Sequence, residues 1–177
     1  MMNQFTFTPF PNLTTERFAL RQLKIEDEDE IFAIRSDDNI LKYLDRPKAN
    51  AIDDARQFIN KINDSISKNE LIYWAINLKD NSKLIGTICL WKISTQQSNA
   101  EVGFELLPDH QGKGVMQGVL PKIIDFGFKT IKLQLIEGEV AANNLKSVIL
   151  LEKHGFVINR RTKNTVVYSL SNSKEKE

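Results

Sequence analysis

A glycine-rich turn, Gln111-Gly112-Lys113-Gly114-Val115-Met116, separates a segment of strand-like alternation from a segment of helical spacing. The alternation ends at Pro108, and apolar residues from Met116 onward recur at intervals of three and four. Glycines at a helix start leave backbone N–H groups uncovered, and the helix dipole favours an anion there. The turn therefore predicts a phosphate-binding site where a strand passes into a helix.

The segments before this turn indicate an antiparallel meander. Alternating polarity predicts strands over residues 17–23, 71–78, 84–93 and 101–107, and a polar turn over residues 80–83 joins the second of these to the third. Helices are expected after the acidic cluster at residues 26–30, over residues 37–44, and from Asp53 onward.

After the turn, helical and strand-like segments alternate along the chain. Helices are expected over residues 114–130 and 144–154, and strands over residues 133–140, 156–160 and 165–170. Because strands and helices alternate from residue 101 onward, some parallel pairing is required within this run. We therefore expect an α/β (α+β) fold in one domain over residues 1–170, followed by a flexible C-terminal tail at residues 171–177.

Charge and composition exclude several classes of function. The 24 basic and 23 acidic side chains nearly cancel, so direct nucleic-acid binding is not expected. Cys89 is the single cysteine, and His110 and His154 have no second ligand at metal spacing, so neither a disulfide nor a metal site is expected. No signal peptide or membrane-length apolar run is present, which predicts a cytoplasmic protein without a membrane partner.

Two familiar phosphate-binding turns fit the glycines poorly. A P-loop needs Ser or Thr after its Gly-Lys pair, and Gly114 occupies that position. A dinucleotide-binding loop needs a third glycine at residue 117, where the chain has Gln117 and reaches Gly118 one residue later. The preceding meander also argues against a dinucleotide-binding fold, which normally places parallel βαβ units there.

A third pattern, Gln/Arg-x-x-Gly-x-Gly/Ala, matches the turn in all but Met116, and here the chain resembles the GNAT superfamily of acetyl-CoA-dependent N-acetyltransferases. Within that superfamily it is most similar to the ribosomal-protein serine/alanine N-acetyltransferase branch. The resemblance rests on further motifs in the same order, at residues 15–21, 100–104, 144–147 and 152–156. It implies a mixed, mostly antiparallel central sheet of about six to seven strands flanked by about four helices.

The resemblance also implies a site for acetyl-CoA as co-substrate. The pyrophosphate is expected on the N–H groups of the turn, and the pantetheine arm along the main chain of the preceding strand. Asn144 is expected to contact the arm, although an asparagine there also suits a helix N-cap. The implied cofactor-binding residues are Phe104, Glu105, Leu106, Gln111, Gly112, Lys113, Gly114, Val115, Met116, Gln117 and Asn144.

The implied catalytic groups are two carboxylates and a hydroxyl. Glu101 and Glu139 are alternative bases for the acceptor amine, each acting through water, and Ser147 is expected to hydrogen-bond the departing thiolate. Leu151 stands where many relatives carry a tyrosine as general acid, so the thiolate is expected to leave without one. Gly118 stands where a glutamate often follows the glycine turn in the ribosomal branch.

The function implied by the resemblance is acetyl transfer from acetyl-CoA to a primary amine by direct attack, with a protein N-terminal amine as one acceptor. The alternatives are a small-molecule amine acetyltransferase and a non-catalytic acyl-CoA-binding module. The acceptor is expected beside residues 31–44 and 94–99, where no sequence signature identifies it. A monomer and a homodimer are equally compatible with the sequence.

Overall fold

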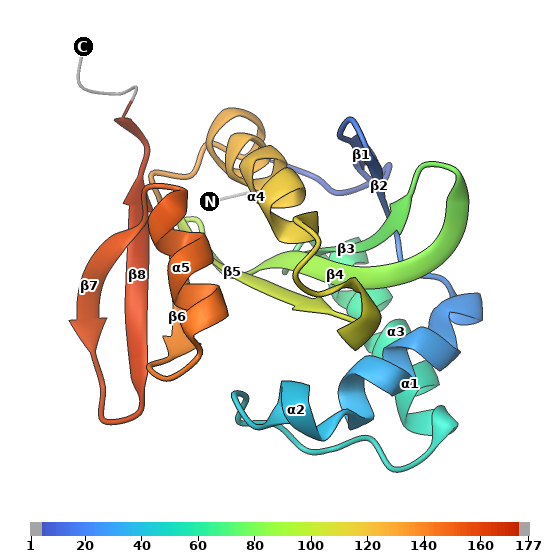
Figure 1. The fold of residues 1–177 in the computed structure, drawn as a ribbon. Helices are drawn as coiled ribbons and strands as arrows, with labels where there is room; N and C mark the ends of the chain where they lie inside the picture. The colour runs from blue at the N-terminus through green and yellow to red at the C-terminus, as the bar shows by residue number, and fades with distance from the viewer. Residues whose placement is uncertain (1–4, 174–177) are drawn as a thin grey trace.

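The computed structural model describes residues 5–173, which form a central sheet with helices packed around it (Figure 1). The described chain contributes one eight-stranded sheet in the order β1-β2-β3-β4-β5-β6-β8-β7. Its strands are β1 (Leu13–Thr14), β2 (Phe18–Arg21), β3 (Ile72–Leu78), β4 (Asn81–Ser94), β5 (Asn99–Leu106), β6 (Leu135–Ala141), β7 (Val157–Arg161) and β8 (Thr165–Ser171).

The predicted mixed sheet is confirmed, with one correction to its size. Every neighbouring pair of strands is antiparallel except β5 and β6, which run parallel. The expected six to seven strands become eight in the described chain because the two-residue strand β1 pairs with β2. Two residues are too few to show the alternation by which strands are predicted.

The helices lie close to their predicted positions. They are η1 (Ile25–Asp27), α1 (Glu28–Ser36), α2 (Asp38–Leu41), α3 (Ile52–Ser67), η2 (Pro108–His110), α4 (Val115–Asp125), η3 (Phe126–Thr130) and α5 (Leu145–Lys153). The helix expected over residues 114–130 is α-helical to Asp125 and ends in a π-helical turn, η3. No helix within residues 5–173 is both long and apolar enough to cross a membrane.

Neighbouring residues of β3 show how the sheet is covered on both faces. Because successive side chains of a strand point to opposite faces, Tyr73 and Trp74 lie on different sides of the sheet. Tyr73 packs edge-on against Phe58 of α3, and Trp74 packs edge-on against Phe126 at the end of α4. Helices α1 and α3 pack on each other on one side, and the C-terminal end of α4 lies on the other, where Phe126 contacts Trp74.

The feature that positions the site is an early end to the pairing between β5 and β6. The two strands pair through three positions, the last joining Glu101 to Glu137, although β5 continues to Leu106 and β6 to Ala141. Beyond Glu101, β6 remains paired with β8 along its whole length, while β5 remains paired with β4. The two strands therefore diverge and leave one edge of β5 open (Figure 1).

The tail expected over residues 171–177 begins within β8 and not after it. Ser171 is the last residue of β8 and pairs with Leu135 of β6. Residues 174–177 of the expected tail lie outside the described residues.

Candidate functional site

The glycine turn adopts the backbone conformation that its sequence requires. Gly112 and Gly114 have φ angles of +73° and +75°, in the left-handed region that side chains with a Cβ rarely adopt. Gly114 is the N-cap residue of α4. A Cβ built on either glycine would meet nothing within 4 Å, so the space above the turn is open.

The N–H groups of the turn are available to a ligand. No group of the described chain accepts a hydrogen bond from the backbone N–H of residues 112–117, and the first main-chain bond of α4 runs from Gly118 N to Gly114 O. These donors lie at the positive end of the α4 dipole. The arrangement is suited to binding an anion such as a phosphate.

Two side chains anchor the turn to the sheet. Gln111 Nε2 donates to the carbonyl oxygen of Leu106 at 3.1 Å, which ties the turn to the end of β5. Arg17 Nη1 lies 3.5 Å from the carbonyl oxygen of Lys113. The end of β5 and the residue before β2, which are distant in sequence, therefore both contact the turn.

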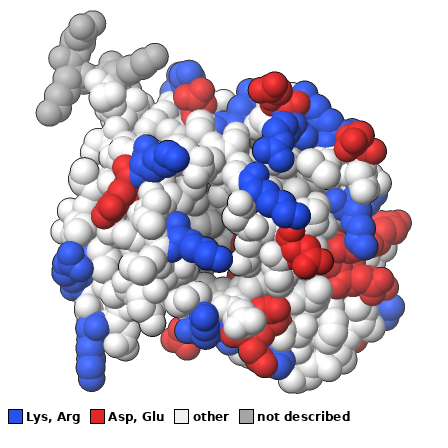
Figure 2. All heavy atoms as spheres, in the orientation of Figure 1, with Lys and Arg blue, Asp and Glu red and all other residues white. Residues whose placement is uncertain are grey.

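A cavity of about 870 Å³ connects the turn to the open edge of β5. Figure 2 shows this face hollowed near its centre, with basic side chains around the hollow. Residues 39–44 close one side and residues 143–150 close another. The predicted cofactor residues on its wall are Phe104, Glu105, Leu106, Gln111, Gly112, Gly114, Val115, Met116, Gln117 and Asn144; Lys113 is not among the lining residues.

Helix α5 presents polar and apolar groups to this cavity. Asn144 is its N-cap and accepts a long hydrogen bond from the backbone N–H of Ser147, so the capping role expected for Asn144 is present. Asn144 and Ser147 both line the cavity. Leu145 and Ile149 line it as well and are 66% and 61% exposed, which provides an apolar surface for a ligand.

Leu151 lies on the opposite side of α5, in the core. Its side chain is fully buried, and a Cβ added to Gly138 of β6 would lie 3.1 Å from Leu151 Cδ1. The position at which the resemblance leads one to expect a tyrosine acid therefore packs against β6 and supplies no proton donor.

The two predicted bases lie away from the cavity wall. Glu101 pairs with Lys92, Nζ to Oε2 at 2.9 Å, and Glu139 is exposed and accepts a hydrogen bond from Thr165 Oγ1 at 2.9 Å. Neither residue lines the cavity. The structure thus brings the predicted cofactor residues other than Lys113 together with Ser147 around the cavity, and leaves Glu101 and Glu139 outside it.

Sequence reasoning assigned Glu105 a role through its main chain and missed its side chain. Glu105 lines the cavity, and its side chain is only 12% exposed and pairs with Arg46, Oε1 to Nη1 at 2.6 Å. Burial raises its pKa above the ordinary glutamate value, although Arg46 and Arg35 act in the opposite direction. The alternation of Glu101, Gly103 and Glu105 on one face of β5 was the available signal.

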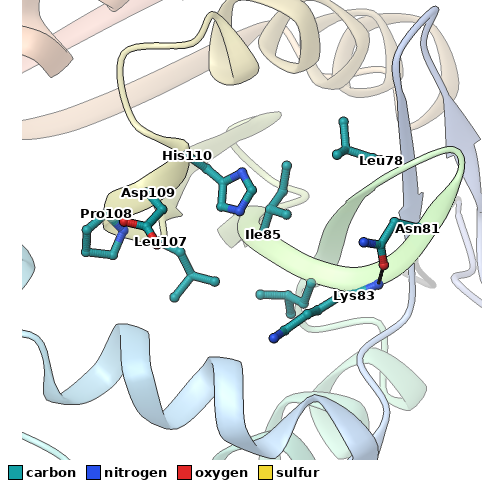
Figure 3. Close-up of a pocket in the computed structure, with 9 residues that line it drawn as sticks. Leu78, Asn81, Lys83, Ile85, Leu107, Pro108, Asp109 and His110 are labelled. Atoms are coloured by element: carbon teal, nitrogen blue, oxygen red, sulfur yellow. Dashed lines mark hydrogen bonds between the residues drawn. The ribbon is translucent and has the colours of Figure 1, made fainter.

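A second cavity, of about 300 Å³, lies outside the predicted site. Figure 3 shows Asp109 and His110 of η2 at one side of it and Asn81 and Lys83 of β4 at another, with apolar side chains such as Ile85 between them. None of the predicted site residues lines it. Within the described residues, no group of three or more His, Cys, Asp or Glu side chains is arranged to hold a metal ion.

Comparison with known proteins identifies the family of this chain and relatives that share its fold. Residues 17–157 match the family model described as "Acetyltransferase (GNAT) domain". The N-acetyltransferase YoaA of Bacillus subtilis (strain 168) is 33% identical over 147 residues, 83% of each chain.

Two solved structures share the fold. The ribosomal-protein-S5-alanine acetyltransferase from Vibrio fischeri has a TM-score of 0.80 and 23% identity, covering 94% of this chain and 100% of that one. The spermidine N-acetyltransferase from Vibrio cholerae, in complex with CoA and spermine, has a TM-score of 0.77 and 26% identity, covering 89% and 96%.

Proposed function

The chain belongs to the GNAT acetyltransferase family and is an N-acetyltransferase, and from this membership we propose that it transfers acetyl from acetyl-CoA to a primary amine. The observation that carries the proposal is the cavity joining the open N–H groups of residues 112–117 to the open edge of β5. One domain over residues 1–170, acting in the cytoplasm, performs the reaction.

The turn suits the pyrophosphate of coenzyme A. Its N–H donors have no protein partner in the described chain, and the absence of a Cβ at Gly112 and Gly114 lets an anion approach the backbone closely. Lys146 lines the same cavity and adds positive charge for the phosphates. Solved relatives of this fold hold acetyl-CoA or CoA, which supports the same donor here.

The pantetheine arm is proposed to lie along Phe104, Glu105 and Leu106, where β5 has no neighbour on the β6 side. The apolar side chains of Leu145 and Ile149 face it from α5. Asn144 and Ser147 then stand near its thiol end, with Ser147 as a hydrogen-bond donor to the sulfur. A thiolate leaves readily at its ordinary pKa of about 8.5, so no acid is required at Leu151.

The acceptor amine must lose protons as the new amide forms. Glu101 and Glu139 are the alternative bases, and either would accept a proton through water because neither lines the cavity. Phe104 and Glu105 border the acceptor side, together with residues 39–44. This placement puts the acceptor between α2 and the end of β5.

We favour a protein N-terminal amine as the acceptor over a polyamine. Lys42 and Lys146 line the cavity, and its acidic lining residue, Glu105, is already paired with Arg46. A polycation would therefore meet mostly positive charge, whereas a single ammonium needs only one carboxylate. Spermidine remains the second candidate because a spermidine N-acetyltransferase is 26% identical over most of the chain.

An acceptor screen with acetyl-CoA tests the proposal. Peptides beginning with Ser, Ala or Met are compared with spermidine, following release of the coenzyme A thiol and formation of the acetylated product by mass spectrometry. We expect turnover with at least one peptide and a lower kcat/KM for spermidine. Binding of acetyl-CoA without turnover of any amine would contradict the proposal.

A further inference from the structure

Among the described residues, Glu105 is the one acidic residue that lines the cavity. Every other residue recorded on the cavity wall is basic, neutral polar or apolar. Glu105 shares a face of β5 with Glu101, and a Cβ added at Gly103, between them, would lie beside Cys89 and Trp91. Alternation along β5 thus directs the Glu105 carboxylate toward the side of the sheet covered by α1 and α3.

Arg46 forms an ion pair with this carboxylate. Its Nη1 lies 2.6 Å from Glu105 Oε1, and the two side chains are 20% and 12% exposed. Arg46 Nε and Nη2 are buried without a hydrogen-bond partner in the described chain, and the Arg46 guanidinium pairs with Glu105 through Nη1. No hydrogen bond from a described residue reaches the second carboxylate oxygen, Oε2, which leaves it able to accept from a ligand.

The surrounding groups decide how basic this carboxylate is. Arg35 of α1 and Arg46, which follows α2, act on it as cations, while Tyr73 of β3 and Cys89 of β4 interact with it from the sheet. Burial raises the pKa of Glu105, and Arg46 and Arg35 oppose that rise only in part. A buried carboxylate with a raised pKa is a better proton acceptor than an exposed one.

Building on the proposed function, we propose that Glu105 binds the ammonium of the acceptor through Oε2 and takes a proton from it. Loss of this proton to the carboxylate leaves a neutral amine, whose lone pair forms the N–C bond as the C–S bond of the thioester breaks. The second proton lost from nitrogen passes to the departing thiolate, and Glu105 later releases its own proton to water. Arg46 is a positioning residue that fixes the rotamer of Glu105.

Glu105 differs from Glu101 and Glu139 in its proposed role because it contacts the acceptor amine directly. Glu101 is paired with Lys92 and Glu139 with Thr165, and reaching the amine from either requires water. Under this assignment those two carboxylates only pass protons onward to solvent. The pH dependence of acetyl transfer then reports the ionisation of Glu105.

The test compares Glu105→Gln with Glu137→Gln, a control glutamate that pairs with Arg160 outside the cavity wall. For each protein, kcat/KM with the acceptor peptide is measured against pH, together with acetyl-CoA affinity and the unfolding midpoint. We expect kcat/KM to fall by about 100-fold or more in Glu105→Gln, with acetyl-CoA affinity little changed, and to be retained in Glu137→Gln. A folded Glu105→Gln protein with the wild-type rate and pH profile would overturn the assignment.

Arg46→Gln gives a second test that does not depend on the folding of Glu105→Gln. Because Arg46 lowers the pKa of Glu105, its removal should move the acidic limb of the kcat/KM profile to higher pH. A merely structural role for the pair would lower activity without moving this limb, and that result would also overturn the assignment. A wild-type protein that acetylates no amine would instead defeat the proposed function itself.

Discussion

Glu101 and Glu137 form the last residue pair that joins β5 to β6, and the two parallel strands separate immediately beyond it. This separation leaves the edge of β5 from Val102 to Leu106 without a β6 partner. The glycine turn lies at the far end of the same edge, so one continuous surface runs from the strand to the start of α4. The location of the proposed acetyl-CoA site follows from this geometry.

The first prediction concerns the charge of the glycine turn. Gly114→Asp places a carboxylate beside the pyrophosphate, and repulsion between such charges predicts acetyl-CoA affinity lower by roughly 100-fold or more. Gly114→Ala is the matched control, because it introduces the strain of the +75° φ angle without charge and should cost about tenfold at most. Calorimetric titration measures both, and equal affinities for the Asp variant and wild type would refute the site.

The second prediction ranks the carboxylates. Glu101→Gln and Glu139→Gln should each lower kcat/KM by about tenfold or less, because a group that acts through water contributes less than one in direct contact. The measurement is the rate of thiol release across pH for both variants and for Glu105→Gln. If either Glu101→Gln or Glu139→Gln is as slow as Glu105→Gln, that residue is the base.

The third prediction concerns stability. Leu151 is fully buried against Gly138, so Leu151→Ala should lower the free energy of unfolding by about 2–5 kcal/mol. Leu145→Ala, in the same helix but 66% exposed, should change it by only about 0.5 kcal/mol. Urea unfolding followed by circular dichroism compares them, and a Leu151→Ala protein as stable as wild type would show that this side chain does not pack in the core.

The fourth prediction concerns the single cysteine. Burial and the neighbouring Glu105 raise the pKa of the Cys89 thiol to about 12. Because the thiolate is the reactive form, and ionisation becomes appreciable only near the raised pKa, Cys89 should react with a disulfide reagent far more slowly at pH 8 than free cysteine does. Reaction at the rate of free cysteine would show that the thiol is accessible and ionises normally.

The sequence predicts the main-chain features of the candidate site: the glycine turn, the helix that follows it and the order of the elements around it. The turn at residues 112–117 was recognisable because left-handed glycines and a following helix leave a local pattern. The strand and helix order was recognisable for the same reason, since each element carries its own periodicity. Asn144 was correctly expected at a helix start, where it caps α5.

The features that were missed depend on contacts between distant segments. Glu105 lines the cavity and pairs with Arg46, which lies after α2, and periodicity does not reveal a contact between segments so far apart. The placement of β8 between β6 and β7 likewise reverses the sequence order of the last two strands. Strand alternation places Glu101 and Glu105 on one face of β5, but only the fold shows which of them reaches the cavity.

The most direct measurement is a titration of acetyl-CoA into the ¹⁵N-labelled protein, followed through its backbone amide resonances. The account predicts that the largest shifts occur at residues 112–117, whose N–H groups should bind the pyrophosphate, with a second set at residues 104–106. Shifts confined to another surface, or no shifts at saturating acetyl-CoA, would contradict the central claim that this turn and the open edge of β5 hold the acetyl donor.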